Sequence, residues 1–95
     1  MTHAYVVGQM TVKDPAKWAL YRSQVLATLS HFGGELVFRG QQVRALSGLC
    51  THPDMVVIRF PSLLEAEAWH SSESYQALVP LRQEAADVVL TTYAS

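Results

Sequence analysis

The sequence predicts an α+β fold in which strands and helical regions follow one another in the order β-α-β-β-α-β. Runs rich in β-branched and apolar residues have the composition of strands, and they lie at residues 4–12, 35–39, 55–60 and 87–93. An apolar stripe with helical spacing follows the first run. A Pro-Ser pair opens a second helical region after the third run. The order of these segments is what predicts the fold class.

Composition predicts one small soluble domain that covers residues 1–95. The chain is 49% hydrophobic and 16% charged, which is rich in apolar residues for a chain of this length and suggests that more surface is buried in an oligomer. The net charge of -1 and the absence of a basic stripe argue against nucleic acid as a partner. The sequence has neither a spanning apolar run nor a leader, so we expect a cytoplasmic protein without a membrane partner.

The first strand, from Ala4 to Val12, is apolar on both alternating faces, so we expect it to be covered on both sides. Gly8 inside it indicates a bulge or the close approach of a helix or a ligand. Asp14 and Pro15 are then a typical helix start. The helix that follows carries an apolar stripe and is expected to end at Gly33-Gly34; the stripe comprises Trp18, Tyr21, Val25, Leu29 and Phe32.

The middle of the chain is expected to be a strand, a return segment and a second strand. Residues 35–39 lead into Gly40, and residues 42–49 have the small side chains of a segment that pairs back as a hairpin or meander partner. Residues 51–54 have the composition of a turn. Residues 55–60 are the strongest strand signal in the chain and are apolar on both faces, apart from Arg59.

The second helical region is expected to be broken into segments. Ser62 and Glu65 have the spacing of a capping box, which predicts a helix that begins at Leu63. This helix should stop near residues 71–72, where serines can cap a second segment. Pro80 should then kink that segment or begin a new turn around Val79.

A β-α-β-β-α-β order predicts a ferredoxin-like sandwich, with both helical regions on one face of an antiparallel sheet. Apolar residues fall on both parities of the strands, so the second face of the sheet also needs a cover. A second copy of the chain is the simplest cover. We therefore expect a homodimer that forms through the sheet face and closes a dimeric α/β barrel.

Motifs along nearly the whole chain resemble one family. They are FPSLLEAEAWHSSESYQAL with the later Arg82 and Ala85-Ala86-Asp87, together with Asp14-Pro15, Tyr21, Phe32-Gly33-Gly34 and Arg39-Gly40. This combination is similar to the Domain of Unknown Function 1330 family. The resemblance implies a homodimeric α/β barrel with ferredoxin-like protomers, and it implies no activity. Pro80 and the Cys50-Thr51-His52 connection depart from the family pattern.

Arg39 and Arg82 are the charged candidates for ligand binding. A guanidinium holds a carboxylate or enolate oxygen through two parallel hydrogen bonds, which suits a small acidic or phenolic ligand. The alternative for each arginine is a structural ion pair. Arg39 would pair with the nearby Glu35, and Arg82 with Glu84 or Asp87.

Aromatic side chains are candidates for the walls of a pocket between the helices and the sheet. The candidates are Trp18, Tyr21, Trp69 and Tyr75, and a tyrosine hydroxyl would act there as a donor or an acid. Aromatic residues at helical spacing are usually core residues, which is the alternative for all four. His70 is the candidate catalytic acid or base, because imidazole titrates near neutrality. Its alternative is a solvated histidine at a helix end.

The sequence predicts neither a metal nor a cofactor. The four histidines are far apart, and only Cys50 and His52 are neighbouring ligand types, which is weak evidence for a metal site. The lone Cys50 cannot form an internal disulfide, which agrees with a reducing compartment. No glycine-rich phosphate loop or nucleophile elbow is present.

Two kinds of function fit these observations. The first is binding of a small aromatic or carboxylate-bearing molecule, with cofactor-free catalysis as an extension, and it predicts a ligand-sized cavity. The alternative is a non-catalytic dimer with a structural, sensing or interaction role. A purely structural or interaction protein would have a filled interior and an exposed apolar patch beyond the dimer interface.

Overall fold

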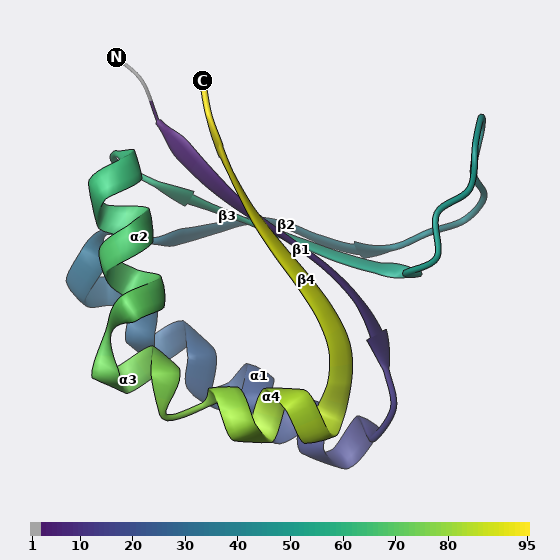
Figure 1. The fold of residues 1–95 in the computed structure, drawn as a ribbon, viewed down its shortest axis with the longest axis horizontal. Coiled ribbons are helices and arrows are strands. Elements are labelled where there is room, and N and C mark those ends of the chain that lie inside the picture. The colour runs from purple at the N-terminus through teal and green to yellow at the C-terminus, as the bar shows by residue number, and fades with distance from the viewer. Residues whose placement is uncertain (1–2) are drawn as a thin grey trace.

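The computed structural model describes residues 3–95 as an antiparallel sheet with helices on one of its faces (Figure 1). The strands are β1 (Ala4–Val12), β2 (Glu35–Gln41), β3 (Asp54–Phe60) and β4 (Ala86–Ala94). The helices are α1 (Pro15–Leu29), α2 (Leu63–Ser71), α3 (Glu73–Gln76) and α4 (Val79–Ala85), and a 3₁₀ turn, η1 (Ser30–Phe32), follows α1.

The sheet has the strand order β2-β3-β1-β4, and every neighbouring pair is antiparallel. This order, with the helical regions between β1 and β2 and between β3 and β4, is the ferredoxin-like topology, so the predicted fold class is confirmed. Because β1 is central and pairs along its whole length with β4, the two ends of the described chain lie close together (Figure 1).

The ends of α1 follow from its sequence. Asp14 caps the helix by accepting a hydrogen bond from the Lys17 amide at 3.1 Å, and Pro15 occupies the first turn. The chain leaves the following 3₁₀ turn through Gly33, whose φ of 70° lies in the left-handed region. Both predicted helix signals are therefore confirmed.

The second helical region begins at Leu63 as predicted, but not through the predicted capping box. The Ser62 side chain makes no bond to a backbone amide of α2 and instead donates to the Glu65 carboxylate. Ser72 does cap α3, because its hydroxyl accepts from the Tyr75 amide at 3.2 Å. Pro80 lies in the first turn of α4, so it begins a new helix at Val79, which is one of the two predicted outcomes.

The prediction that residues 42–49 pair back onto the sheet is wrong. They belong to a loop that projects from the body of the protein between β2 and β3 (Figure 1). The antiparallel partner of β2 is instead β3, which pairs with it from Glu35 opposite Arg59 to Gln41 opposite Asp54. The loop leaves three apolar side chains 87–93% exposed, namely Val43, Leu46 and Leu49.

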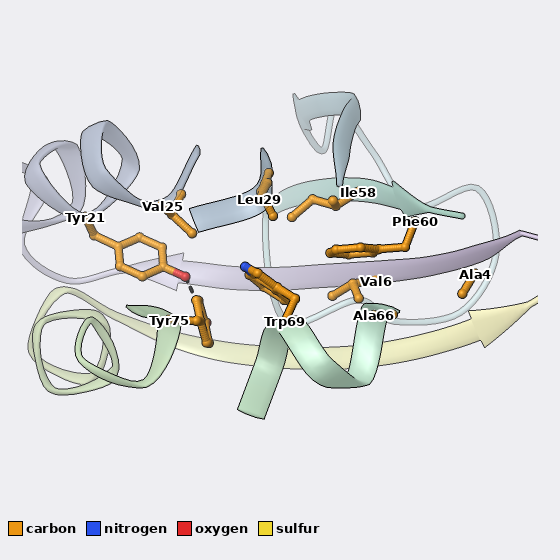
Figure 2. Packing of buried hydrophobic residues seen from close by; sticks show 10 residues of the cluster. All are labelled: Ala4, Val6, Tyr21, Val25, Leu29, Ile58, Phe60, Ala66, Trp69 and Tyr75. Atoms are coloured by element: carbon orange, nitrogen blue, oxygen red, sulfur yellow. Dashed lines mark hydrogen bonds between the residues drawn. The ribbon is translucent and has the colours of Figure 1, made fainter. Parts of the chain in front are cut away.

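The core lies between the helices and one face of the sheet (Figure 2). The sheet contributes Ala4, Val6, Ile58 and Phe60, and the helices contribute Tyr21, Val25, Leu29, Ala66, Trp69 and Tyr75. The opposite face of the sheet also carries apolar side chains, and Phe38, Val89 and Tyr93 are 47–56% exposed there. Among residues 3–95, no helix has the length and apolar character needed to cross a membrane.

Candidate functional site

A cavity of about 420 Å³ lies between α1 and the helix-facing side of the sheet. Its walls are mainly apolar and include Trp18, Tyr21 and Val25 from α1, Val56 and Leu90 from the sheet and Trp69 from α2. The helical spacing of the α1 residues turns them to one face, and the alternation of the strands turns every second side chain of the sheet toward them. Several of the core residues that Figure 2 shows also line this cavity, namely Tyr21, Val25, Leu29, Ile58 and Trp69.

Gly8 explains how the strands pack beneath this cavity. A Cβ atom at this position would lie 2.9 Å from Cγ1 of Val56 and 3.1 Å from Cδ2 of Leu90, which are both cavity residues. The groups closest to Gly8 are thus side chains of strands and not of the helix that was expected there, and β1 has no bulge at this position.

A bulge in β2 places Arg39 at the cavity. Leu36 and Arg39 are three residues apart, which would turn them to opposite faces of a regular strand. The pairing register with β3 shifts between Leu36 and Phe38, so that Leu36 lies opposite Ile58 and Arg39 opposite Val56. Leu36 and Arg39 consequently both line the cavity.

Arg39 has a second cation beside it. Burial and the positive charge of Arg22 lower the pKa of the Arg39 guanidinium, although the residue as a whole is exposed. A guanidinium stays charged in spite of such a shift, so two positive charges lie near the apolar cavity. Asp54 and Gln41, which lie opposite each other in the register, complete the polar part of the lining.

The predicted ion pair of Arg39 with Glu35 is wrong. Glu35 pairs with Arg59, since both residues lie opposite each other in the β2–β3 register. Within residues 3–95, neither Arg22 nor Arg39 forms a salt bridge. The bulge explains why Glu35 and Arg39 do not pair, because it turns Arg39 toward the cavity, whereas Glu35 lies opposite Arg59 and does not line the cavity.

Tyr21 and Tyr75 form a buried hydrogen bond between their hydroxyls, 2.9 Å apart (Figure 2). Arg82 donates to the Tyr75 hydroxyl, also at 2.9 Å, so residues of α1, α3 and α4 are joined. Burial, with a smaller contribution from Tyr75, raises the pKa of the Tyr21 phenol well above its ordinary value. Tyr21 lines the cavity, whereas Tyr75 and Arg82 do not.

Arg82 is likewise free of the carboxylates that sequence proximity suggested. Glu84 pairs with Lys17 at 2.6 Å, and Asp87 pairs with Lys13 at 3.4 Å. These contacts tie α4 and the start of β4 to the region where α1 begins. The guanidinium of Arg82 is therefore available for the Tyr75 hydroxyl.

The two tryptophans both line the cavity, although they are held differently. Trp69 is 1% exposed, and its indole N–H donates to the Thr28 hydroxyl at 2.9 Å. Its ring centroid lies 4.2 Å from that of Tyr75. Trp18 is partly buried and stacks on Tyr21, with 5.0 Å between ring centroids. Trp69 is thus both a core residue and part of the cavity wall.

His70 points elsewhere. It is exposed on the last turn of α2 and lines a second, more open hollow of about 440 Å³ between α2 and β4, together with Trp69 and Thr91. His70 does not line the cavity at Arg39. Its ring centroid lies 5.6 Å from that of Tyr75.

Residues 3–95 contain no group of three or more potential metal ligands. Cys50 is exposed on the projecting loop, where its thiol approaches the His52 carbonyl oxygen at 3.4 Å. The His52 ring bonds to the Thr11 hydroxyl at 2.9 Å. The Cys50 thiol and the His52 ring thus each have a contact with another protein group and not with each other.

Arg22 is a site residue that the sequence reasoning missed. Arg22 directly follows Tyr21, and because it is charged it is not part of the apolar stripe that contains Tyr21. Helical spacing nevertheless contained the signal, because position 22 lies four residues after Trp18 and three before Val25, and both of these line the cavity.

Comparison with known proteins places this arrangement in a family. The model of the family described as "Domain of unknown function (DUF1330)" matches residues 3–93. No curated protein matches the chain. The chain is similar to the crystal structure of a protein of unknown function from Rhodopseudomonas palustris, with a TM-score of 0.80 and 17% sequence identity; the match covers 96% of this chain and 80% of that one.

Two further solved structures show the same fold at lower identity. SnoaB, a cofactor-independent oxygenase from Streptomyces nogalater, matches with a TM-score of 0.69 and 12% identity, over 98% of this chain and 92% of that one. A dimeric ferredoxin-like protein of unknown function from Thermobifida fusca matches with a TM-score of 0.66 and 13% identity, over 99% and 92%. At these identities the likeness shows the fold alone.

Proposed function

Because this chain belongs to the DUF1330 family, whose description states no activity, we propose its function from the site: the cavity between α1 and the sheet binds a small molecule that has an aromatic body and a carboxylate. The observation that carries the proposal is the position of Arg39. A bulge turns this arginine toward an apolar cavity, where it lies beside Arg22 and forms no salt bridge with residues 3–95.

The size and lining of the cavity support a ligand of this kind. About 420 Å³ lies within the range of roughly 300–1,000 Å³ that is typical of small-molecule sites. Trp18, which is partly buried, offers an aromatic surface on which a planar ring can stack, and Val25 and Val56 offer aliphatic contacts. An apolar body buried here would remove its surface from water at a gain of about 25 cal/mol per Å².

The charges favour an anionic group at one end of the ligand. Arg22 and Arg39 repel each other, and an anion between them would relieve that repulsion and accept charge-assisted hydrogen bonds. Asp54 also lines the cavity and contributes one negative charge, which leaves the three groups with a net positive charge. A monoanionic carboxylate matches that excess.

Cofactor-free catalysis is an extension of this proposal. SnoaB, which shares the fold, is described as a cofactor-independent oxygenase, and fold likeness at 12% identity supports only the compatibility of the scaffold with such chemistry. His70 stays a predicted acid or base. Its place in the second hollow means that a substrate would have to reach that hollow for His70 to touch it.

We also propose that the protein works as a homodimer through the outer face of the sheet. That face exposes Phe38, Val89 and Tyr93 by about half of their surface, and a second copy would cover them. A protein of the same fold from Thermobifida fusca is described as dimeric, which supports the compatibility of the fold with this assembly.

The second candidate function is an interaction module, and the projecting loop favours it. Val43, Leu46 and Leu49 are almost fully exposed on that loop. Exposed apolar side chains of this kind are what an interaction protein would present to a partner. The open cavity argues for the ligand-binding function, because a purely structural protein was expected to have a filled interior.

A thermal-shift panel tests the ligand-binding proposal. Aromatic carboxylates, such as benzoates and naphthoates, should raise the melting temperature, and the corresponding neutral amides should not. Arg39→Ala should weaken carboxylate binding roughly tenfold to a hundredfold, which is the range for losing a hydrogen bond to a charged group. Arg59→Ala is the matched control, because Arg59 is paired with Glu35 outside the cavity lining. Equal shifts in wild type and Arg39→Ala would refute the proposed site.

A further inference from the structure

We propose that Arg82, Tyr75 and Tyr21 form a chain of hydrogen bonds with one direction, which presents the Tyr21 hydroxyl proton to a phenolate, enolate or carbonyl oxygen of a molecule in the cavity. This inference rests on the proposed ligand-binding function and adds a second recognition point to it. The ligand would then have two oxygen-bearing ends. A carboxylate would lie toward Arg39 and Arg22, and a conjugated hydroxyl or keto oxygen would lie toward Tyr21.

Counting protons gives the direction of the chain. A guanidinium only donates, so the Tyr75 oxygen must accept from Arg82 at 2.9 Å. The Tyr75 and Tyr21 oxygens share one further hydrogen bond at 2.9 Å, in which either hydroxyl can supply the proton. Each hydroxyl has a single proton, and within residues 3–95 the side chains make no other hydrogen bond to either oxygen.

Burial decides between the two directions. If Tyr21 donated to Tyr75, the Tyr75 proton would have no acceptor although Tyr75 is fully buried, and leaving a buried donor unsatisfied costs about 1–3 kcal/mol. If Tyr75 donates to Tyr21, as the bond drawn in Figure 2 allows, the Tyr75 proton has an acceptor and the Tyr21 proton is the free one. Tyr21 is also buried, at 6% exposed, but unlike Tyr75 it lines the cavity, where a water molecule or a ligand oxygen can accept this proton.

The charges around the chain suit an acceptor oxygen that carries negative charge. Arg82 lies behind the two hydroxyls, and its positive charge acts through them toward the cavity. The raised pKa of Tyr21 keeps its hydroxyl protonated near neutral pH, so it acts as a donor and not as a base. The other charged groups that line the cavity are Arg22 on α1, Arg39 on β2 and Asp54 on β3.

Tyr75 and Arg82 are therefore positioning residues that act through Tyr21. A merely structural role would also explain a Tyr-Tyr-Arg contact between α1, α3 and α4. The two roles differ in what they do to a ligand, because only the directed chain changes the ionisation of a phenol bound beside Tyr21.

A pair of ligands tests this difference. The first is a nitrobenzoate with a hydroxyl para to its nitro group, whose ionised form absorbs visible light, and the second is the same nitrobenzoate without the hydroxyl. The pKa of the bound nitrophenol is read from its absorbance at saturating protein over a range of pH. With Tyr21→Phe this pKa should rise by about one unit, which corresponds to a tenfold weaker preference for the phenolate. The affinity for the hydroxyl-free nitrobenzoate should stay within about twofold of wild type, because its carboxylate still meets Arg39.

Variants of Tyr75 and Arg82 test whether these two residues act on the ligand through Tyr21. Tyr75→Phe keeps the ring and breaks the chain, so it should raise the pKa of the bound nitrophenol by less than Tyr21→Phe does. Arg82→Met should raise the pKa of the bound nitrophenol by a similar partial amount. Arg82→Lys keeps a charged donor, so with this variant the pKa should lie close to the wild-type value. If Arg82→Met does not fold, as judged by circular dichroism, Tyr75→Phe alone carries this part of the test.

The two proposals fail in different ways. If the hydroxyl-free nitrobenzoate does not bind to the wild type, the ligand-binding function is wrong and the chain has no ligand to act on. If it binds, but the pKa of the bound nitrophenol is the same in wild type and Tyr21→Phe, the ligand-binding function stands and the directed chain is wrong.

Discussion

The hydroxyl oxygens of Tyr21 and Tyr75 lie 2.9 Å apart in the core, although 54 residues separate them in the sequence. This contact joins α1 to α3, and the Arg82 guanidinium extends it to α4. The buried polar contact adds a defined orientation for Tyr21 at the edge of the cavity, at the cost of placing two phenols out of contact with water.

Stability at alkaline pH should depend on Tyr21. Burial raises the pKa of this phenol in the folded protein, whereas in the unfolded chain it ionises near its ordinary value of about 10. Below that pH both the folded and the unfolded state carry the proton, and the contribution of Tyr21 to the free energy of unfolding is fully present. As the pH rises above about 10, the unfolded state loses its proton first, so the free energy of unfolding falls by up to about 1.4 kcal/mol per pH unit for this group. Urea unfolding between neutral and alkaline pH measures the slope.

Tyr21→Phe should remove that part of the alkaline slope. The wild-type protein, measured at the same protein concentration and pH values, is the reference. A slope in Tyr21→Phe equal to that of wild type would mean that the Tyr21 phenol ionises alike in both states.

Gly33 and Gly48 offer a comparison between backbone strain and steric overlap. Both have positive φ, 70° and 78°, so alanine at either position should cost about 1–2 kcal/mol of backbone strain. A Cβ on Gly33 would lie 2.8 Å from Cγ of Pro61, whereas a Cβ on Gly48 would meet nothing within 4 Å. We expect Gly33→Ala to lower the free energy of unfolding by about 1 kcal/mol more than Gly48→Ala. Equal losses in chemical denaturation would show that Pro61 moves aside freely.

Much of the fold could be predicted because its signals are local. Asp14 and Pro15 mark a helix start, Gly33 marks a left-handed stop and Pro80 marks a new helix, and each acts on its own few residues. The Ser62–Glu65 motif also looked local. It failed because the two side chains bond to each other, which sequence spacing does not distinguish from bonds to the backbone.

The site was harder to predict because it depends on register and on partners distant in sequence. Glu35 lies near Arg39 along the chain, yet the β2–β3 register gives it to Arg59. The bulge between Leu36 and Phe38 decides which face Arg39 occupies, and bulges leave little trace in a single sequence. The sequence named Tyr21, Tyr75 and Arg82 as candidates but not their mutual contact, because only the packing of three helices brings them together.

Replacing Arg39 should not destabilise the ligand-free protein. Arg39 lies beside another cation and forms no salt bridge with residues 3–95, so Arg39→Leu relieves repulsion and adds apolar surface to the cavity wall. We expect a free energy of unfolding equal to that of wild type or up to about 1 kcal/mol higher, as is common where function and stability conflict. Arg59→Leu, which breaks an exposed pair with Glu35, should give no gain. A loss above about 1 kcal/mol for Arg39→Leu would point to a structural role for Arg39.

The proposed homodimer can be tested separately from ligand binding. Light scattering at micromolar concentration should give a particle with twice the mass of one chain. Val89→Lys puts a charge on the outer sheet face and should shift the particle toward the monomer, because an unpaired charge would be buried between the two sheets. Leu64→Lys is the matched control on exposed helix surface. A wild-type protein that stays monomeric would contradict this assembly.

The central claim is that the cavity at Arg39 binds an aromatic carboxylate, and the tryptophan fluorescence of the protein tests it most directly. The chain has two tryptophans, Trp18 and Trp69, and both line the cavity. Titration with a nitrobenzoate, whose nitro group quenches indole fluorescence, should give saturable quenching in wild type and Arg59→Ala and a roughly tenfold or larger rise in Kd in Arg39→Ala. The neutral nitrobenzamide should quench only weakly and without saturation. Quenching that is linear in wild type, or identical for the acid and the amide, would contradict the claim.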